Sequence, residues 1–273
     1  PVAFLIYKGD TIFIECKYLL KNNQLSFDFP NGYDTTNQLI IDPTLIASTL
    51  SGSTGNNWGH TATYDIEENI FTGARCFSFG YPTTFGAYQQ NYAGGTGFWP
   101  SDIAISKLNP NGSSVIWSTY LGGNGNDAPH SMITDNNGNL YVYGSSESSN
   151  YPTTISSFSS SNSGNFDIVI SHLNNNGNNL IGSTYIGGNL NDGQNIIETN
   201  YGDIFRGEIF LDINNDIYIS SFSSSNNFPT TLGSFQNNNA GSQDVVVFKF
   251  NNNLSQLLWS TYLGSSGNDA GYG

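Results

Sequence analysis

The phrase Trp-Ser-Thr-Tyr-Leu-Gly at residues 117–122 decides the fold, because it returns along the chain. It recurs unchanged at residues 259–264, as Gly-Ser-Thr-Tyr-Ile-Gly at residues 182–187, and in the degenerate form Ala-Ser-Thr-Leu-Ser-Gly at residues 47–52. Self-similarity at a fixed period indicates an architecture in which every copy is one supersecondary unit. The chain therefore contains three complete units and the beginning of a fourth.

Three further landmarks follow the phrase in the same order in each unit. They are an acidic turn (Asp65, Asp135, Asp212), an aromatic residue before Pro-Thr-Thr (Tyr81, Tyr151, Phe228) and an aspartate that heads an apolar run (Asp102, Asp167, Asp244). The acidic turn precedes the proline by the same interval in all three units, 65 to 82, 135 to 152 and 212 to 229. These intervals define a period of about 65 residues, with insertions in the first and third units.

Each unit predicts four short strands, which in the second unit fall at 130–135, 140–146, 167–173 and 179–187. The run Ile168, Val169 and Ile170 is apolar on both faces, as expected for a strand that is covered on both sides. Asn- and Gly-rich segments between the strands suit tight turns, since both residues tolerate positive φ. No segment has the periodicity of an amphipathic helix, so we expect an all-β chain.

Four-stranded units in tandem predict a β-propeller, in which each sheet packs between its neighbours around an axis. Three complete blades fit, at about residues 53–122, 123–187 and 188–264, and a further blade begins after them. Because closed propellers typically have about 4–8 blades, we expect an incomplete ring and interpret the chain as a fragment of a longer protein. Residues 1–42 carry no repeat and are interpreted as the C-terminal part of a β-sandwich, followed by the propeller blades at 43–273.

Composition excludes several classes of protein. The 273 residues include 21 acidic and 7 basic ones, for a net charge of −14, so nucleic acid and anionic membranes are unfavourable partners. No apolar run approaches the roughly 18 residues of a membrane-spanning helix. An Asn-rich, Lys-poor chain with 14% aromatic residues is typical of an extracellular or cell-surface protein. Cys16 and Cys76 are too few for a disulfide framework, and whether they bond to each other stays open.

The order of these words resembles the bacterial SBBP β-propeller repeat over about residues 45–273. The resemblance rests on Ser-Thr-Tyr-Leu-Gly-Gly, Asn-Asp, Asp-x-x-Gly-Asn-x-Tyr-Val and aromatic-Pro-Thr-Thr. It implies a module of a large protein at the outer surface of a Gram-negative bacterium, of the kind often exported by the type IX secretion route. The first unit departs from the pattern at residues 48–51 and at Asn57, so its blade is expected to lie at an edge or to close the ring.

One aspartate recurs at the start of a predicted strand, at Asp127, Asp192 and Asp269. A catalytic carboxylate pair needs two different environments, whereas one aspartate per blade meets nearly the same environment each time. We therefore expect these side chains to cap backbone amides, with weak calcium sites as the alternative. The repeat predicts no catalytic residue and no cofactor other than this calcium.

Two histidines occupy equivalent positions in two units. His60 and His130 each stand five residues before the acidic turn, and Trp58 lies beside the first of them. Neighbouring blades would direct these side chains to one channel mouth, where they line a wet channel or form a ligand or metal site. By contrast, His172 shares its position with Lys107 and Lys249, and we expect it on a solvated strand face.

The insertions break the symmetry of the repeat, and functional residues tend to lie in such loops. The insertion of the third unit carries Glu198, Tyr201, Asp203 and Arg206, and that of the first carries Phe98 and Trp99. Exposed aromatic and charged side chains suit sugar stacking or a protein partner, and packed loops without a ligand are the alternative.

Regular repetition without an asymmetric catalytic set predicts a non-enzymatic protein. The leading hypothesis is a secreted or cell-surface propeller that acts as a structural, adhesive or ligand-binding module, with a glycan or a surface protein as its partner. The first alternative is a carbohydrate-active enzyme that uses carboxylates such as Glu198, Asp203 or Glu208. The second is an exported cargo fragment held by the channel of a secretion machinery.

Overall fold

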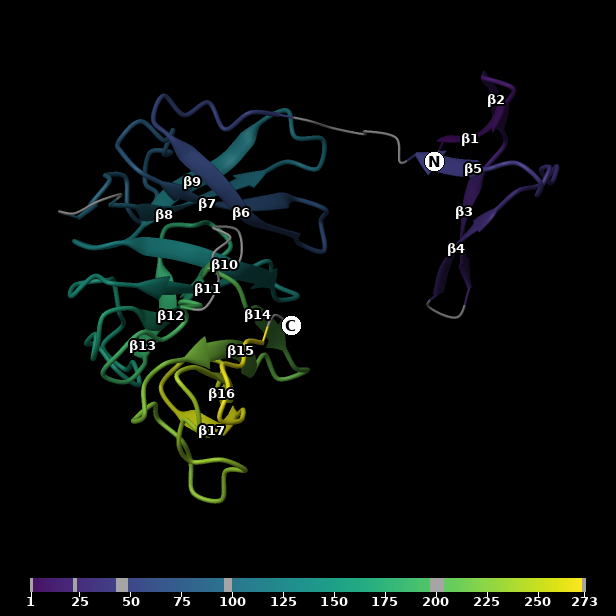
Figure 1. Cartoon of the computed structure of the whole chain (residues 1–273). Helices are drawn as coiled ribbons and strands as arrows, with labels where there is room; N and C mark the ends of the chain where they lie inside the picture. The colour runs from purple at the N-terminus through teal and green to yellow at the C-terminus, as the bar shows by residue number, and fades with distance from the viewer. Residues whose placement is uncertain (1, 22–23, 43–48, 96–99, 197–203, 272–273) are drawn as a thin grey trace. The chain divides into compact units, whose positions relative to one another are not determined.

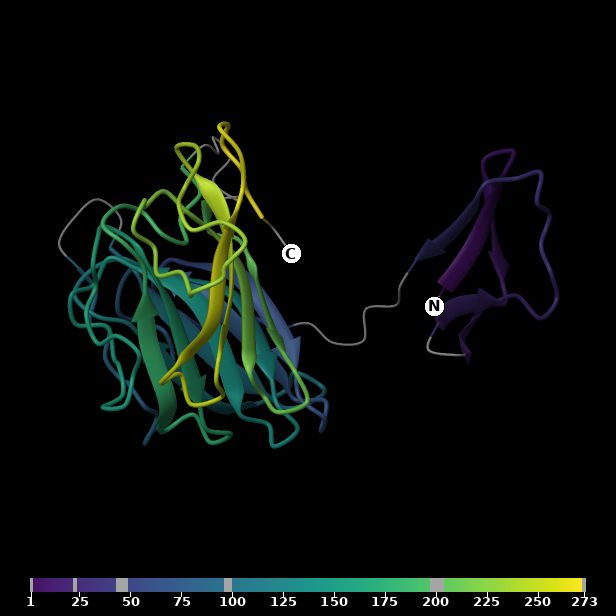
Figure 2. The ribbon, with the colours of Figure 1, turned by 90° about the horizontal axis from the view of Figure 1, so that it is seen from below.

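The computed structural model describes residues 2–21, 24–42, 49–95, 100–196 and 204–271. It divides into two compact units, Pro1–Ser48 and Thr49–Gly273. The seventeen elements with defined bounds in these ranges are all β-strands (Figure 1 and Figure 2). The predicted all-β fold is confirmed.

The first unit holds two small antiparallel sheets. Its strands are β1 (Val2–Tyr7) between β2 (Asp10–Ile14) and β5 (Leu39–Asp42), and β3 (Lys17–Lys21) paired with β4 (Gln24–Asp28). Lys8 and Gly9 join β1 to β2 with positive φ at both residues, as a tight two-residue hairpin requires. That these strands form the end of a β-sandwich stays a prediction.

The second unit consists of three four-stranded antiparallel sheets, one for each repeat, and the strand order follows the chain. The first blade has β6 (Asn57–Tyr64), β7 (Ile70–Cys76), β8 (Asp102–Leu108) and β9 (Val115–Leu121); the second has β10 (Asp127–Thr134), β11 (Leu140–Ser146), β12 (Asp167–Leu173) and β13 (Leu180–Ile186); the third has β14 (Glu208–Leu211), β15 (Ile217–Ser223), β16 (Asp244–Phe250) and β17 (Leu257–Leu263). Figure 1 shows the sheets following one another as the colour passes from blue to yellow. They are propeller-type blades, and the blades in the described ranges do not close into a ring.

The hydrophobic core lies between consecutive blades. Ile103 and Leu121 of the first blade share one apolar cluster with Val169 and Leu173 of the second. On its other face β12 contributes to a second cluster with the third blade. Both faces of β12 are therefore buried, and this burial explains its uninterrupted apolar sequence.

The two repeated phrases bind each other within a blade. The hydroxyl of Tyr120 accepts a hydrogen bond from the Tyr81 amide at 3.0 Å, and Thr84 N donates to Ser118 O at 3.0 Å. The same bonds join Tyr185 to the Tyr151 amide and Tyr262 to the Phe228 amide. Pro-Thr-Thr thus fastens the loop after the second strand to the outer edge of the fourth.

The repeated aspartates hold backbone amides at the junctions of the blades. Asp127 Oδ2 accepts from Gly123 N at 2.8 Å, Asp192 Oδ2 from Gly188 N at 2.6 Å, and Asp269 Oδ2 from Ser265 N at 2.7 Å. Asp102 accepts from the amides of Ala93 and Gly94 at 2.7 and 2.9 Å. These carboxylates therefore have a structural use in every blade.

Burial of these carboxyl groups makes stability depend on pH. Burial, aided by the charge of Asp127, raises the pKa of Asp102 to about 7, although the Ala93 and Gly94 amides oppose it. Burial likewise raises the pKa of Asp167 to about 7. A carboxyl whose pKa is raised on folding stabilises the protein below its unfolded pKa, and that stability is lost as the pH rises through the folded value. The buried histidines act in the opposite direction over this range, so the test compares Asp102→Asn with the parent chain. We expect the melting temperature of Asp102→Asn, relative to that of the parent, to rise between pH 5 and pH 8. A difference that does not change with pH would contradict the assignment, and circular dichroism melts measure it.

The expectation that His172 lies on a solvated strand face is wrong. Lys107 and His172 are buried, because the adjacent blade covers this end of the strand. Lys107 Nζ lies 2.9 Å from Asp65 Oδ2, and the His172 ring stacks on Tyr141 at 3.8 Å. Burial lowers the pKa of His172 to about 4, so the ring is uncharged at neutral pH.

Candidate functional site

Four of the residues predicted to bind a ligand come together at one cavity. Trp58, His60, His130 and Arg206 line a cavity of about 550 Å³, together with Glu208. The predicted residues Phe98, Trp99, Glu198, Tyr201 and Asp203 lie outside the described residues. The candidate calcium ligands Asp127, Asp192 and Asp269 are not among the described residues that line this cavity.

The first strands of the three blades build the cavity. β6 contacts β10 and β10 contacts β14, so these strands lie side by side on the inner edge of the blades (Figure 1). In the first blade the ladder shifts register between Gly59 and Thr61, and in the second between Pro129 and Ser131. His60 and His130 are therefore the extra residues of two equivalent β-bulges, and a bulge redirects a side chain out of the regular alternation.

The His130 ring is held by hydrogen bonds at both nitrogens. Nδ1 donates to the Arg206 carbonyl at 2.9 Å, and Nε2 accepts from Ser145 Oγ at 3.0 Å. Burial, with the neighbouring His60, lowers the pKa of His130 to about 3. The neutral His130 ring therefore lines the cavity in a fixed orientation. Neither nitrogen can bind a metal unless its hydrogen bond to Arg206 or Ser145 is broken.

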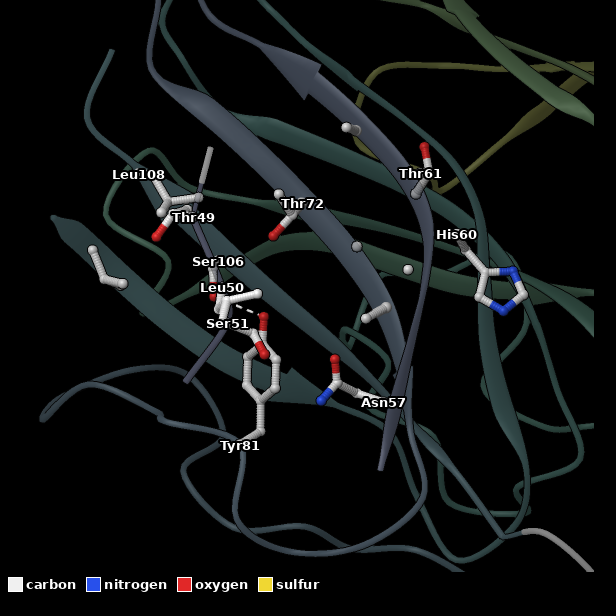
Figure 3. Close-up of a pocket in the computed structure, with 15 residues that line it drawn as sticks. Thr49, Leu50, Ser51, Asn57, His60, Thr61, Thr72, Tyr81, Ser106 and Leu108 are labelled. Atoms are coloured by element: carbon white, nitrogen blue, oxygen red, sulfur yellow. Dashed lines mark hydrogen bonds between the residues drawn. The ribbon is translucent and has the colours of Figure 1, made fainter. Parts of the chain in front are cut away.

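His60 is half-buried on the first blade. Burial, followed by the charge of Arg75, lowers the pKa of His60 to about 4. The imidazole is therefore neutral at pH 7 and able to donate one hydrogen bond and accept another. Figure 3 shows the His60 ring pointing away from Tyr81 and Ser106, which lie on the opposite side of β6.

Phe205 is a cavity residue that the sequence analysis did not single out. Its ring centroid lies 6.3 Å from that of His60 and 5.7 Å from that of His130, and the Arg75 guanidinium stands 4.6 Å from it. Phe205 is adjacent to Arg206 at the end of the third unit's insertion. The insertion breaks the symmetry of the repeat, and Phe205 is its last aromatic residue. That position is the sequence signal from which Phe205 could have been predicted as a cavity residue.

Glu208 and Trp58 give the cavity its polar and aromatic ends. Glu208 accepts hydrogen bonds from Ser131 and from the Ile209 amide. The Trp58 ring contacts Phe77 edge-on, with centroids 4.7 Å apart, and stays 39% exposed. Glu208 is the only carboxylate among the described residues that line the cavity. Within the described ranges no group of three His, Cys, Asp or Glu side chains could hold a metal ion.

A second hollow lies on the face of the first blade that no other described blade covers. It has a volume of about 490 Å³, and Thr49, Leu50 and Ser51 lie along it. Figure 3 shows these residues near Tyr81 and Ser106, whose hydroxyl groups are 2.7 Å apart. His60 borders both hollows, so one strand, β6, separates them.

The comparisons with known proteins support a β-propeller repeat in one stretch of the chain. In the described part of the chain, no helix has the length and apolar character needed to cross a membrane. No curated protein matches the chain. Residues 1–44 match a domain of unknown function, DUF7948. Residues 116–152, which run from the end of the first blade to the proline of Pro-Thr-Thr in the second, match the family model SBBP, a beta-propeller repeat, so this stretch of the chain is similar to repeats of that family.

Proposed function

We propose that the chain is a non-enzymatic, ligand-binding β-propeller module of a secreted or cell-surface protein of a Gram-negative bacterium. The observation that carries the proposal is the cavity at the inner edge of the blades, where neutral His60 and His130, exposed Trp58 and Glu208 converge. Export by the type IX route belongs to the same proposal and rests on the repeat alone.

A glycan is the ligand class that this cavity favours. The neutral His60 imidazole can donate a hydrogen bond to a hydroxyl group and accept another, and the Glu208 carboxylate can accept from hydroxyl groups. The exposed indole of Trp58 provides a flat apolar face on which a sugar ring stacks. The net charge of −14 disfavours polyanionic ligands. An adhesive role at a cell surface follows if the glycan belongs to another cell or to the host matrix.

Trp58→Ala tests the proposal, with Trp259→Ala as its matched control. The two indoles are almost equally exposed, at 39% and 37%, but only Trp58 lines the cavity. After a glycan array selects a ligand, we expect Trp58→Ala to weaken its affinity at least tenfold, which corresponds to about 1.4 kcal/mol, while Trp259→Ala leaves it unchanged. Isothermal titration measures both affinities.

Two results would overturn the proposal. One is an array on which no glycan binds, which would leave a structural role. The other is an equal loss of affinity in both variants, which would move the ligand away from the cavity. Hydrolysis of a bound glycan that Glu208→Gln abolishes would favour the enzyme alternative instead.

A further inference from the structure

A lysine amine, an aspartate carboxylate and an asparagine amide meet at the junction between the first and second blades. Lys107 lies on β8, Asp65 in the turn between β6 and β7 of the same blade, and Asn175 in the turn between β12 and β13 of the next. Lys107 Nζ lies 2.9 Å from Asp65 Oδ2 and donates a hydrogen bond to Asn175 Oδ1. The amine therefore contacts the carboxylate of its own blade and the side-chain amide of another.

The protein covers this amine almost completely. The side chains of Lys107 and Asp65 are 4% and 1% exposed, and Lys107 Nζ stands 5.0 Å from the centre of the Phe71 ring. Burial penalises both charges, so the transfer of a proton from the ammonium to the carboxylate costs less here than in water. The neutral amine that this transfer leaves is a nucleophile, whereas the ammonium is not.

Hydrogen bonds hold Asn175 against the amine. Asn175 Nδ2 donates to the Asn137 carbonyl at 3.1 Å, and the backbone amide of Asn175 donates to Asn139 Oδ1 at 3.0 Å. The Asn175 carbonyl accepts from Trp117 Nε1 at 2.7 Å. Gly138 leaves room for the side-chain amide, since an added Cβ would lie 3.0 Å from Asn175 Cγ. Reacting atoms need a separation of about 3–3.5 Å, and contact with the amide oxygen brings the lysine nitrogen close to that distance from the amide carbon.

Asp65 is placed to move the protons that a reaction between these groups needs. Its Oδ1 accepts from the amides of Glu67 and Asn69 at 3.0 and 2.9 Å, and its Oδ2 accepts from Asn69 Nδ2 at 3.0 Å. These bonds fix the carboxylate, and Oδ2 also contacts Lys107 Nζ. A carboxylate held against a nucleophile can accept its proton and pass it on to a leaving group.

Among the described residues, this set is complete at one junction. In the second blade, His172 stands at the position of Lys107, so that junction has no amine. In the third blade, Lys249 Nζ lies 2.9 Å from Asp212 and 2.9 Å from Asp216, and its contacts in the described ranges include no side-chain amide. Lys249 is therefore an internal control, a lysine beside carboxylates with no amide to attack.

We propose that Lys107 and Asn175 form an isopeptide bond between the first two blades, with Asp65 as the catalytic residue. Asp65 takes a proton from the Lys107 ammonium, and the free amine attacks Asn175 Cγ, which forms the new N–C bond. The bond from Cγ to Nδ2 then breaks. Of the three ammonium protons, one stays on the new amide nitrogen, and Asp65 passes the other two to Nδ2, which leaves as an ammonium ion. Asp65 is a carboxylate again at the end, and no oxidant or further reactant is consumed.

This bond links the two blades covalently, which the cysteines do not, since Cys16 and Cys76 are free. It joins positions 68 residues apart in the chain, and closing such a loop lowers the entropy of the unfolded state. The ion pair between Lys107 and Asp65 is the state of the folded chain before the bond forms. The reaction occurs once in each chain, so it is a self-modification and not an enzymatic activity. The inference is independent of the ligand proposed for the inner cavity.

Mass spectrometry of the 273-residue chain tests the proposal. After refolding and incubation at neutral pH, we expect the intact chain to be lighter than its sequence mass by one ammonia molecule. Tandem mass spectrometry of a chymotryptic digest is expected to identify a branched peptide that joins residue 107 to residue 175. Trypsin is expected to stop cleaving after Lys107, because its amine has become an amide. The branched peptide distinguishes this bond from the loss of ammonia at an Asn-Gly sequence.

Variants separate the roles of the three groups. Asn175→Ala is expected to abolish the branched peptide, whereas Lys249→Arg, the matched control for a change of lysine, is expected to retain it in full. Asp65→Asn keeps both reacting groups and is expected to slow bond formation at least tenfold, because no carboxylate accepts the proton. Refolding of chain purified in denaturant starts the time course, and circular dichroism shows that each variant folds.

The pH profile of the parent chain checks the role of Asp65 without a substitution. Proton transfer within the pair predicts a rate that is level from neutral to mildly alkaline pH and falls in the acid range, where Asp65 is protonated. A rate that keeps rising with pH would show that solvent takes the proton, and this overturns the role of Asp65. A folded parent chain that keeps its full sequence mass, or ammonia loss without the branched peptide, overturns the bond itself.

Discussion

Replacing Gly122 by alanine is expected to destabilise the protein by about 2–4 kcal/mol, because no space exists for a methyl group at this position. A Cβ on Gly122 would lie 2.7 Å from Asp102 Cγ and 2.8 Å from Asp127 Oδ2. Both carboxyl groups are fully buried, and each is held by backbone amides. Neither can move aside without breaking these bonds, so the strain passes to the junction between the first two blades.

Thermal melts followed by circular dichroism measure this effect. A loss of about 1 kcal/mol lowers the melting temperature of a chain of this size by roughly 2–4 °C. Gly267→Ala is the control, since its added methyl group would meet only Ser265 Oγ at 3.8 Å. Equal melting temperatures for the two variants would show that the aspartates are not held as tightly as their hydrogen bonds indicate.

Lys107→Met is expected to cost about 3–5 kcal/mol, because it leaves the buried Asp65 carboxylate without its cation. The pair is almost inaccessible to solvent, with Lys107 Nζ 2.9 Å from Asp65 Oδ2. Burial acts to raise the pKa of Asp65, but hydrogen bonds from Lys107 and Asn69 outweigh it and keep that pKa below its ordinary value. The equivalent Lys249 pairs with Asp212 and Asp216 at partly exposed positions.

The control for this variant is Lys249→Met, for which we expect a loss of about 1 kcal/mol or less, since solvent screens the pair. Denaturant unfolding at pH 7 and pH 4 measures both variants. A carboxyl with a lowered pKa stabilises the folded state above its unfolded pKa, and this contribution disappears as the pH falls. The difference between Lys107→Met and the parent should therefore shrink at pH 4. A loss for Lys107→Met that is no larger than for Lys249→Met would contradict the role of burial.

Strand positions could be predicted because they depend on neighbours in sequence. The strands expected at 140–146 and 167–173 coincide with β11 and β12, where apolar runs end at Asn- and Gly-rich turns. The first strand of that unit was expected at 130–135, yet β10 begins at Asp127. The bulge at His130 lets Asp127 and Ala128 continue the ladder with β11. A bulge carries no periodic signal, so the earlier part of the strand was missed.

The inner cavity could be predicted only in part. His60 and His130 were identified because equivalent positions of a repeat must occupy equivalent places in the blades, and Trp58 because it lies beside His60 in the sequence. His130 contacts the Phe205 ring and donates a hydrogen bond to the Arg206 carbonyl. Both contacts join different repeats, and no spacing in the sequence predicts them. The burial of Lys107 and His172 was missed for the same reason, since a basic residue at a strand end predicts exposure when its neighbouring sheet is unknown.

By itself, the sequence determined the number of blades in the chain, their four-strand composition and the residues that bind loop to strand within each. These properties follow from local periodicity and short-range hydrogen bonds, which every repeat expresses again in the same order. Only the tertiary structure decided which lysine is buried and that both nitrogens of His130 are occupied. Those outcomes depend on how one blade covers the next, and the packing of two sheets is set by both partners together.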